Sequence, residues 1–362
     1  MHVTVLPGDG VGPEVTAQAM AVLREVEELW HLRIETAEFP IGGAAIDAAG
    51  DPLPTATLEA AQKSDAVFLG AVGGPRWDGG AKRPEEGLLR LRRELEVFAN
   101  LRPIRAVPYL TGPAPVRPEI HRTIQYVIVR ELTGGLYFGE SGRVANGCYD
   151  TMVYRRSEIA RVTRVAFALA AAEGSHVTLV DKANVLSTSR LWREVVGEVA
   201  SEYPYVTYET ELVDSCAMHL VQDPGRYGVI LTENLFGDIL SDLGAGTLGS
   251  LGLLPSASLG SRGPGLYEPV HGSAPDIAGR NLANPLGAIG AVAMMLRYSL
   301  GAEEAAKAVE ASITDVLADG LRTKDIAAPG QSTVGTDEMG QAVCRAIDRH
   351  AKSRNQAVIP LG

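Results

Sequence analysis

Short apolar runs alternate along the chain with longer segments of helical period. The runs at 3–6, 66–69, 126–129, 177–180 and 228–232 are rich in β-branched residues, which predicts buried strands. Pro13 predicts the start of a helix after the first strand, because proline is favoured at the first helical position. Strands that alternate with helices indicate an α/β fold with a mostly parallel core.

Polar residues follow several of these predicted strands. Arg130 and Glu233 come directly after a strand, and Lys182 comes shortly after another. Ligands in α/β folds bind at the carboxyl ends of strands, so we expect a site there. A chain of 362 residues predicts two domains. The Pro-rich stretch 102–118 and the Gly-rich stretch 244–265 are the best candidates for crossings between them.

Composition excludes several classes of function. The net charge of −11 argues against a nucleic-acid partner, because phosphate backbones require clustered lysine and arginine. The 3 cysteines are far apart and form no C-x-x-C motif, which argues against a disulfide framework or a zinc site. No apolar run of about 18 residues predicts a membrane span, and the N-terminal run is too short for a signal peptide. We therefore expect a cytoplasmic protein with a small-molecule ligand.

Asp238 and Asp242 lie four residues apart in F-G-D-I-L-S-D-L, so on a helix both carboxylates project from one face. Two like charges at this spacing repel each other unless a cation lies between them, and hard divalent cations prefer oxygen ligands. A solvent-exposed acidic face is the commoner explanation of such a pair. The position just past a predicted strand favours a metal site without establishing it.

Arginines are concentrated between residues 90 and 130, against the acidic charge of the whole chain. Guanidinium groups bind carboxylates bidentately, which indicates a small polyacid as ligand. Arg130 follows an apolar strand, whereas Arg90 and Arg93 are expected to be solvated helix charges. Lys182 beside a metal would lose its proton readily and act as a general base, and Tyr137 could donate one. Taken alone, Lys182 is more simply explained as an exposed lysine, and Tyr137 as a half-buried aromatic residue.

The segment L-P-G-D-G-V-G-P-E-V follows the first strand and opens a helix, as a dinucleotide-binding motif does. Its glycines at 8, 10 and 12 give G-x-G-x-G instead of G-x-G-x-x-G. We interpret the segment as a tight turn that can approach a cofactor, and not as evidence for a Rossmann domain.

Longer motifs occur in order along nearly the whole chain. They include G-A-V-G-G-P-R-W-D, F-A-N-L-R-P, V-R-E-L-T-G-G-L-Y-F-G-E, V-D-K-A-N-V-L, F-G-D-I-L-S-D-L and Y-E-P-V-H-G-S-A-P-D-I-A-G. Together they resemble the 3-isopropylmalate dehydrogenases, within the wider family of isocitrate, homoisocitrate and tartrate dehydrogenases. The resemblance implies an α/β, two-domain isopropylmalate/isocitrate dehydrogenase-like fold with a mixed central sheet, which is not a Rossmann fold.

The resemblance also implies how the chain is organised. Residues 1–99 together with 248–362 would form a cofactor-binding domain that contains both termini. Residues 100–247 would form a substrate and dimerisation domain, with a protruding arm near 137–156. The active sites of the expected homodimer would be shared, because Lys182 and Asp214 would enter each site from the neighbouring subunit.

Roles in catalysis follow from the resemblance. The ligands of Mg²⁺ or Mn²⁺ would be Asp214, Asp238 and Asp242. The residues that hold the substrate carboxylates would be Arg92, Arg102 and Arg130. The metal would act as a Lewis acid on the substrate hydroxyl, whose proton Lys182 takes while hydride leaves for NAD⁺. The resulting β-keto acid would lose CO₂, and Tyr137 would protonate the remaining carbon.

NAD is the cofactor that the resemblance implies. Asp276 in H-G-S-A-P-D-I-A-G matches the family residue that accepts hydrogen bonds from the adenosine ribose, where NADP-using relatives carry a lysine and a tyrosine. An aspartate there would repel a 2′-phosphate. The other residues assigned to the cofactor pocket are Val11, Glu268, His271, Gly272, Ser273, Ala274 and Asn284.

The implied substrate is (2R,3S)-3-isopropylmalate, which would be converted to 4-methyl-2-oxopentanoate and CO₂ in leucine biosynthesis. Glu85, Leu88 and Leu89 match the family's pocket for an apolar γ-substituent, with Val185 from the partner. Isocitrate enzymes place serine and asparagine there, and a carboxylate buried unpaired beside the leucines would cost roughly several kcal/mol.

Other substrates and one other class of protein are alternatives. One methylene is worth only about 1–3 kcal/mol, so a related 3-alkylmalate, tartrate or homoisocitrate is possible. A non-catalytic regulatory paralogue is the alternative from another class, but such subunits typically lose the lysine or the metal ligands. Two residues depart from the pattern: Glu233 stands where glycine is common, and Arg90 adds a charge to the substrate segment.

Overall fold

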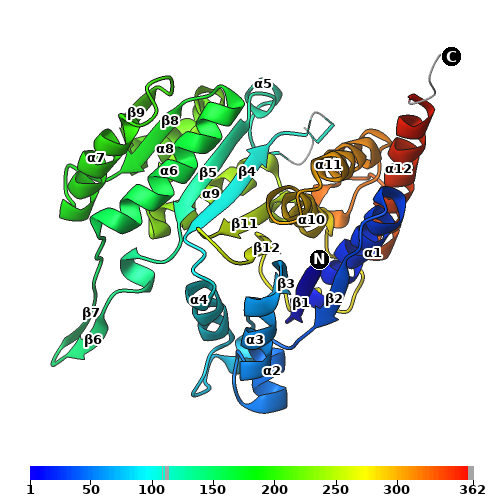
Figure 1. Cartoon of the computed structure of the whole chain (residues 1–362), viewed down its shortest axis with the longest axis horizontal. Helices are drawn as coiled ribbons and strands as arrows, with labels where there is room; N and C mark the ends of the chain where they lie inside the picture. Colours follow the sequence, from blue (N-terminus) through cyan, green and yellow to red (C-terminus); the bar gives the residue numbers. More distant parts are fainter. Residues whose placement is uncertain (108, 111–113, 358–362) are drawn as a thin grey trace.

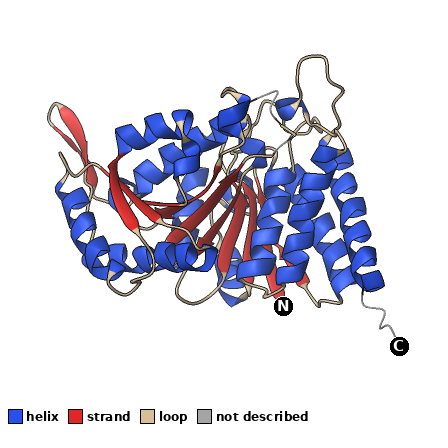
Figure 2. Ribbon diagram, turned by 90° about the horizontal axis from the view of Figure 1, so that it is seen from above, coloured by secondary structure: helices blue, strands red, loops and turns tan. Residues whose placement is uncertain are grey.

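The computed structural model describes residues 1–107, 109–110 and 114–357, with side chains as far as residue 353. Residues 108, 111–113 and 358–362, which fall inside the predicted domain and crossing ranges, lie outside the described residues. A 10-stranded sheet forms the centre of the described part, and helices cover both of its faces (Figures 1 and 2). The strand order is β2-β1-β3-β12-β11-β4-β5-β10-β8-β9.

The strands of this sheet come from the whole length of the chain. Their bounds are β1 His2–Gly8, β2 Glu35–Glu38, β3 Ala66–Ala71, β4 Ala99–Arg105, β5 Gln125–Glu131, β8 Val177–Asp181, β9 Tyr208–Leu212, β10 Val229–Thr232, β11 Pro255–Leu259 and β12 Gly265–Pro269. Every strand run predicted from the apolar pattern overlaps one of them, so those predictions are confirmed. The remaining strands escaped the pattern because polar residues or proline interrupt their apolar runs, as in A-N-L-R-P-I-R of β4 and E-T-A-E of β2.

The sheet is mostly parallel, as expected, but its middle is antiparallel. The outer pairs, such as β1 with β3 and β10 with β8, are parallel. The three central pairs, β12 with β11, β11 with β4 and β4 with β5, are antiparallel. The central strands β4, β11 and β12 lack the apolar runs that marked the parallel ones, so the sequence pattern showed only the parallel parts. The mixed central sheet implied by the family resemblance is what the structure contains.

Two groups of helices cover the sheet. Beside β1, β3 and β12 lie α1 Gly12–Trp30, α10 Leu286–Tyr298, α11 Glu303–Ala318 and α12 Thr336–Ala357. The helices along β5, β8, β9 and β10 are α6 Arg156–Glu173, α7 Ser187–Ala200, α8 Val213–Gln222 and α9 Asn234–Leu248. Near the end of β3 lie α2 Gly42–Ala49, α3 Thr55–Lys63 and α4 Pro84–Glu94. Pro13 stands in the first turn of α1, as predicted.

A short hairpin projects from the body of the molecule. It consists of β6 Ser141–Val144 and β7 Gly147–Asp150, paired antiparallel and almost fully exposed (Figures 1 and 2). The hairpin lies within the range predicted for the dimerisation arm, and that role stays a prediction. No helix in the described part is long and apolar enough to cross a membrane.

His121 offers a test of core energetics away from the sheet ends. It closes the short helix α5 Pro118–His121, is completely buried, and neither ring nitrogen has a hydrogen-bond partner among the described residues. Unpaired buried polar groups cost about 1–3 kcal/mol each. We expect His121→Phe to raise the free energy of unfolding at pH 7 by about 1–2 kcal/mol, measured by urea denaturation.

The pH dependence of that gain has a definite sign. Burial lowers the pKa of His121, so the unfolded chain binds a proton more readily than the folded one. The wild-type chain should therefore lose stability as pH falls below about 6.5, and the advantage of His121→Phe should widen toward pH 5. His2→Phe, at an exposed histidine, is the control. An advantage that shrinks on acidification would contradict the prediction.

Candidate active site

Three buried arginines from different elements converge where the central strands meet α9. Asn100 on β4 pairs with Arg130 on β5, and Arg102 lies two residues beyond Asn100, so their side chains share one face of the sheet. Arg92 reaches the same region from α4 and donates a hydrogen bond to Glu268 Oε1 at 2.7 Å. Burial, followed by repulsion from Arg102 and Arg92, lowers the pKa of Arg130. This concentration of positive charge favours the binding of an anion.

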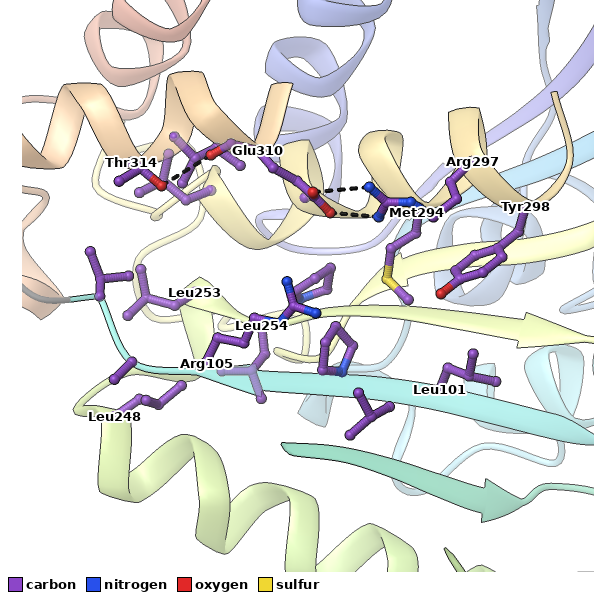
Figure 3. A pocket seen from close by; sticks show the side chains of 18 of the residues that line it. Leu101, Arg105, Leu248, Leu253, Leu254, Met294, Arg297, Tyr298, Glu310 and Thr314 are labelled. Atoms are coloured by element: carbon purple, nitrogen blue, oxygen red, sulfur yellow. Dashed lines mark hydrogen bonds and ion pairs between the residues drawn. The ribbon is translucent and has the colours of Figure 1, made fainter. Parts of the chain in front are cut away.

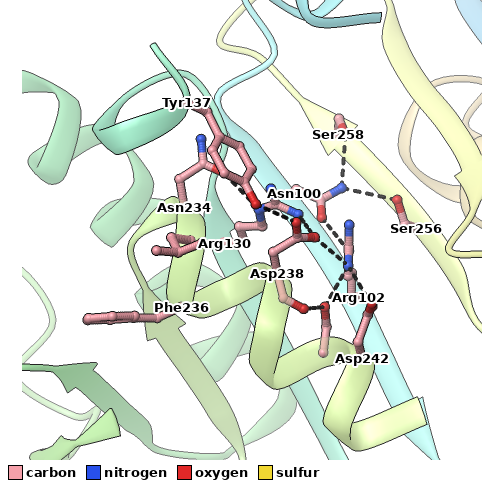
Figure 4. Close-up of polar contacts among 12 residues, drawn as sticks. Asn100, Arg102, Arg130, Tyr137, Asn234, Phe236, Asp238, Asp242, Ser256 and Ser258 are labelled. Atoms are coloured by element: carbon pink, nitrogen blue, oxygen red, sulfur yellow. Dashed lines mark hydrogen bonds and ion pairs between the residues drawn. The ribbon is translucent and has the colours of Figure 1, made fainter. Parts of the chain in front are cut away.

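Polar partners hold each guanidinium in place (Figure 4). Arg102 Nε donates to Asn100 Oδ1 at 2.8 Å, and its terminal nitrogen donates to Ser241 Oγ at 2.5 Å. Arg130 Nε donates to Asn234 Oδ1 at 2.9 Å. Asn100 is fixed in turn by donating to the hydroxyls of β11, which belong to Ser256 and Ser258. The arginines are therefore preorganised and need little side-chain ordering to bind carboxylates.

Asp238 and Asp242 project from α9 toward these arginines (Figure 4). Arg130 forms a close ion pair with Asp238, and Arg102 lies 3.4 Å from Asp238 and 3.7 Å from Asp242. The Tyr137 hydroxyl donates to Asp238 Oδ2 at 2.9 Å. The structure therefore brings together Asp238, Asp242, Arg102, Arg130 and Tyr137, and the acidic pair is not a plain solvated helix face.

The two carboxylates differ in their electrostatics. Burial would raise the pKa of Asp238, but attraction to Arg130 and Arg102 outweighs it and holds that pKa below its usual value. Burial also acts on Asp242, where Arg102 offsets it less, so its pKa is raised. Burial and the charge of Asp238 raise the pKa of Tyr137, which keeps its hydroxyl protonated at neutral pH. The site thus holds one carboxylate compensated by arginines, one largely uncompensated, and a phenol that retains its proton.

The start of α9 explains why Glu233 departs from the family pattern. Its side chain caps the helix by accepting hydrogen bonds from Leu235 N at 3.0 Å and Phe236 N at 2.8 Å. Tyr154 also donates to Glu233, at 3.3 Å. One turn later, a Cβ on Gly237 would stand 2.6 Å from the Arg130 side chain, so only glycine lets the arginine pass this closely.

Lys182 and Asp214 form a second cluster, separate from the first. Lys182 follows β8 and forms a close ion pair with Asp214 in the first turn of α8, and this hydrogen bond lowers the pKa of Asp214. The Lys182 backbone is anchored by Ser189 Oγ, which accepts from its N–H at 3.1 Å. Val185, assigned to the substrate pocket, is 64% exposed. The Asp214 side chain is 63% exposed and that of Lys182 is 27% exposed.

The predicted substrate segment is a helix in this structure, α4. Leu88 and Leu89 are partly buried and precede buried Arg92 by four and three residues, which places all three on neighbouring turns of one face. Arg90 points elsewhere, because it donates to the carbonyl of Leu53 and lies 3.3 Å from Asp51. The extra charge of Arg90 is therefore compensated outside the arginine cluster.

Glu85, also assigned to the substrate pocket, lies in the first turn of α4. A Cβ on Gly73 would stand 2.8 Å from Glu85 Oε1, so the Gly-rich loop after β3 passes directly beside it. The carboxylate is therefore close to the end of a parallel strand, where ligands bind in this class of fold.

The segment assigned to the cofactor lies against the N-terminal glycine turn. Val11 N donates to Ser273 O at 2.8 Å, and a Cβ on Gly10 would stand 2.0 Å from that oxygen. The backbone of the turn therefore packs directly against the backbone of residues 271–276, with no room for a side chain between them. Ala274 has a φ of 37°, a left-handed conformation that costs about 1–3 kcal/mol outside glycine. Such stored strain is typical of a functional loop.

Some side chains of the segment 271–284, which is assigned to the cofactor, have polar atoms that are available for hydrogen bonds to a ligand. His271 Nδ1 lies 2.9 Å from Gly272 O, whereas its buried Nε2 has no partner among the described residues. Burial lowers the pKa of His271, so the ring is neutral at pH 7 and presents one free nitrogen. Asp276 and Gly272 are exposed, and Asn284 is buried and donates to Asp325 at 3.0 Å.

Several residues of the site were missed by sequence reasoning. Asn100, Asn234, Ser241, Ser256 and Ser258 are short polar side chains whose types are common everywhere in proteins. Two of them carried a usable signal: Asn100 is two residues from Arg102 on a strand, and Ser241 is three residues from Asp238 on a helix. Arg105 belongs to the arginine-rich stretch 90–130, but strand alternation places it on the opposite face from Arg102.

Comparison with known proteins gives one family. Residues 2–343 match the family model described as isocitrate/isopropylmalate dehydrogenase. A 3-isopropylmalate dehydrogenase of Shouchella clausii is 53% identical over 353 residues, which cover 96% of this chain and 97% of that protein. One from Rhodopirellula baltica is 51% identical over 349 residues, covering 94% and 97%.

Solved structures agree with this assignment. An isocitrate dehydrogenase from Methylococcus capsulatus superposes with a TM-score of 0.85 at 36% identity and covers 96% of this chain and 99% of that one. A β-decarboxylating dehydrogenase from Thermococcus kodakarensis has a TM-score of 0.82 at 37% identity and covers 100% and 99%. These neighbours confirm the predicted fold class. The chain is a decarboxylating dehydrogenase, and it belongs to the isocitrate/isopropylmalate dehydrogenase family.

Proposed function

We propose that the enzyme oxidises and decarboxylates (2R,3S)-3-isopropylmalate with NAD, giving 4-methyl-2-oxopentanoate and CO₂ for leucine biosynthesis. The observation that carries the proposal is the face of α4, where Leu88 and Leu89 adjoin the buried Arg92. This face combines an apolar surface with a cationic one, which suits a dicarboxylate that bears one branched alkyl group. The names of the curated relatives support the same substrate.

The residues present fit a divalent metal only in part within one chain. Among the described residues no three His, Cys, Asp or Glu side chains gather closely enough to hold an ion. Asp238 and Asp242 supply two oxygen donors, and the charge of Asp242, which Arg102 offsets only in part, suits a cation. Asp214, bound to Lys182 elsewhere in the chain, would complete the set from a partner subunit. Bound Mg²⁺ or Mn²⁺ would supply Lewis-acid chemistry toward the substrate hydroxyl.

The chain's own residues divide the remaining work. Arg92, Arg102 and Arg130 hold the two substrate carboxylates, which neutralises the mutual repulsion of the guanidinium groups. Lys182 of the partner subunit accepts the hydroxyl proton during hydride transfer. The protonated Tyr137 hydroxyl, positioned by its hydrogen bond to Asp238, delivers a proton to carbon after CO₂ has left.

A homodimer with shared sites accounts for the two separate clusters. Val185 and Asp214 are exposed, and Lys182 pairs with Asp214 instead of with Asp238. Exposed apolar side chains on the adjacent helices α8 and α9 support an interface there. These are Met218, Val221 and Ile239.

NAD is the cofactor that fits the segment 271–284. The unpaired Nε2 of His271 and the free carboxylate of Asp276 offer an acceptor to adenosine hydroxyl or amino groups. The carboxylate of Asp276 disfavours a 2′-phosphate by repulsion.

A substrate panel tests the function. We expect the purified enzyme with Mn²⁺ to reduce NAD, but not NADP, when given 3-isopropylmalate, with kcat/KM about tenfold to a hundredfold higher than for malates that lack the isopropyl group. Isocitrate, homoisocitrate and tartrate should be turned over poorly, as followed by NADH absorbance. Equal or higher kcat/KM for isocitrate or tartrate would overturn the proposed substrate, and no turnover of any member would favour a non-catalytic paralogue.

A further inference from the structure

A cavity of about 480 Å³ (Figure 3) is lined by the side chains of β4 that alternate with those of the candidate active site, so it lies on the reverse face of the sheet. Strand β4 separates the two: Arg102 faces the active site, while Leu101, Pro103 and Arg105 line the cavity. One wall comes from β4, β5 and the ends of α6 and α9. The facing wall comes from β11, α10 and α11. The volume is within the range of about 300–1,000 Å³ typical of small-molecule sites.

The lining of this cavity is somewhat more apolar than polar, and its polar groups come from both walls. The apolar lining includes Leu101, Val127, Leu248, Leu254, Met294 and Ile313. The polar groups are Arg105, Glu173, Arg297 and Tyr298, with Glu303 and Glu310. A mainly apolar pocket with a few convergent polar groups is the usual composition of a ligand site.

The charged groups differ in how fully they are paired. Arg297 is saturated, because it binds Glu310 through both terminal nitrogens, at 2.6 and 3.0 Å, and Glu303 at 2.8 Å. Arg105 approaches Glu173 at 3.8 Å without a hydrogen bond. In the described part of the chain this is the only partner that Arg105 has. Arg105 and Glu173 therefore retain hydrogen-bonding capacity of opposite sign at one end of the cavity.

Tyr298 adds a third polar group to this end. Its hydroxyl has no hydrogen bond within the described residues. Burial raises its pKa more than the nearby Arg297 lowers it, and Glu173 and Glu310 add to the rise, so the phenol stays protonated and can donate. It lies close enough to Arg105 and Glu173 for their charges to act on it.

We propose that this cavity binds a small apolar α-amino acid. Its carboxylate would be held by Arg105 and the Tyr298 hydroxyl, its ammonium group by Glu173, and its side chain by the apolar lining. The carboxylates of Glu173, Glu303 and Glu310 would repel a simple anion. Arg105 would repel a simple cation. A zwitterion satisfies both signs of charge at once. The site is distinct from the proposed active site and does not depend on the proposed reaction.

Calorimetric titration of the enzyme with three isosteric probes tests the ligand class. The probes are L-leucine, 4-methylpentanoate, which lacks the ammonium group, and 3-methylbutylamine, which lacks the carboxylate. We expect L-leucine to bind one site per chain, at least about tenfold more tightly than either analogue, because each analogue loses the charged hydrogen bond to one of the two partly exposed groups, Arg105 or Glu173. Equal affinity for the three probes, tighter binding of a singly charged one, or no binding of L-leucine would overturn the proposal.

Variants and competition locate the binding site. Arg105→Gln should weaken L-leucine binding about tenfold or more, and Thr314→Trp, at an exposed position on the cavity wall, should block it. Arg122→Gln, at an exposed arginine outside the cavity, should leave binding unchanged. Binding should persist under saturating 3-isopropylmalate. Displacement by that compound, or unchanged binding in both cavity variants, would assign the ligand to another site, and neither outcome depends on whether the enzyme turns over.

Discussion

Lys182→Met should lower kcat by about 10²–10⁴-fold, because it removes the proposed general base. The fold should survive the change, since Asp214 is 63% exposed and ion pairs with an exposed partner contribute at most about 1 kcal/mol. Steady-state NADH production measures the loss, and urea denaturation shows that the variant is folded. A kcat within about threefold of wild type would exclude Lys182 as the base.

Mixed dimers extend this prediction to the shared site. We expect Lys182→Met and Asp238→Asn chains, each inactive alone, to recover about a quarter of wild-type activity after equal mixing and reassembly, because half of the dimers then contain one intact site. The matched control mixes Asp238→Asn with Asp242→Asn, which lie in the same half of the site. Every site in that heterodimer carries one change, so no activity should return. Recovery in the control, or none in the test pair, would argue that each site is built from one chain.

Asp242→Asn should raise the Mn²⁺ concentration needed for half-saturation by about 10²-fold or more, because it removes a proposed metal ligand. Mn²⁺ binding can be followed by electron paramagnetic resonance without substrate or cofactor, so the result does not depend on turnover. Asp319→Asn, at an exposed carboxylate at the end of α11, is the matched control and should bind Mn²⁺ normally. Unchanged Mn²⁺ binding in Asp242→Asn would remove Asp242 from the metal site.

Asp242→Asn should slightly stabilise the fold of the metal-free protein, although it weakens metal binding. Burial raises the pKa of Asp242, and the charge of Asp238 one turn away adds to this, so the ionised Asp242 is unfavourable without a cation. Removing a like-charge pair at this spacing should stabilise the metal-free fold by up to about 0.5 kcal/mol. Metal-free Asp242→Asn should therefore melt at or slightly above the wild-type temperature, yet gain less from added Mn²⁺. A large destabilisation without metal would indicate that Asp242 is structural.

Local pattern was sufficient for the start of α1, for the helix that carries Asp238 and Asp242, and for the strands of continuous apolar sequence, because strands buried on both faces must be continuously apolar. It failed for β4 and β11, which build the centre of the sheet. Arg102 and Asn100 on β4 make its alternation hard to recognise, since these polar residues point inward to the site. The functional residues on β4 thus prevented its recognition as a strand from the sequence.

The sequence by itself determined which chemical groups share a local element and which fold class the chain adopts. The spacing of Asp238 and Asp242 placed two carboxylates on one helix face, and the ordered motifs predicted the fold class that the comparisons confirm. The residues assigned to the metal, substrate and cofactor remain a prediction for the experiments above. These inferences succeed because helix periodicity and motif order are properties of the chain alone.

Only the tertiary structure decided which charged residues form ion pairs with one another. It paired Arg130 with Asp238 across more than a hundred residues of sequence, turned Arg90 toward Asp51, and separated Lys182 and Asp214 from the acidic pair of α9. It also placed Arg102 and Arg105, three residues apart, on opposite faces of one strand, one beside the active site and one in a cavity. The physical reason is that electrostatic effects depend on distance and burial, which are fixed only when strands distant in sequence become neighbours in the sheet.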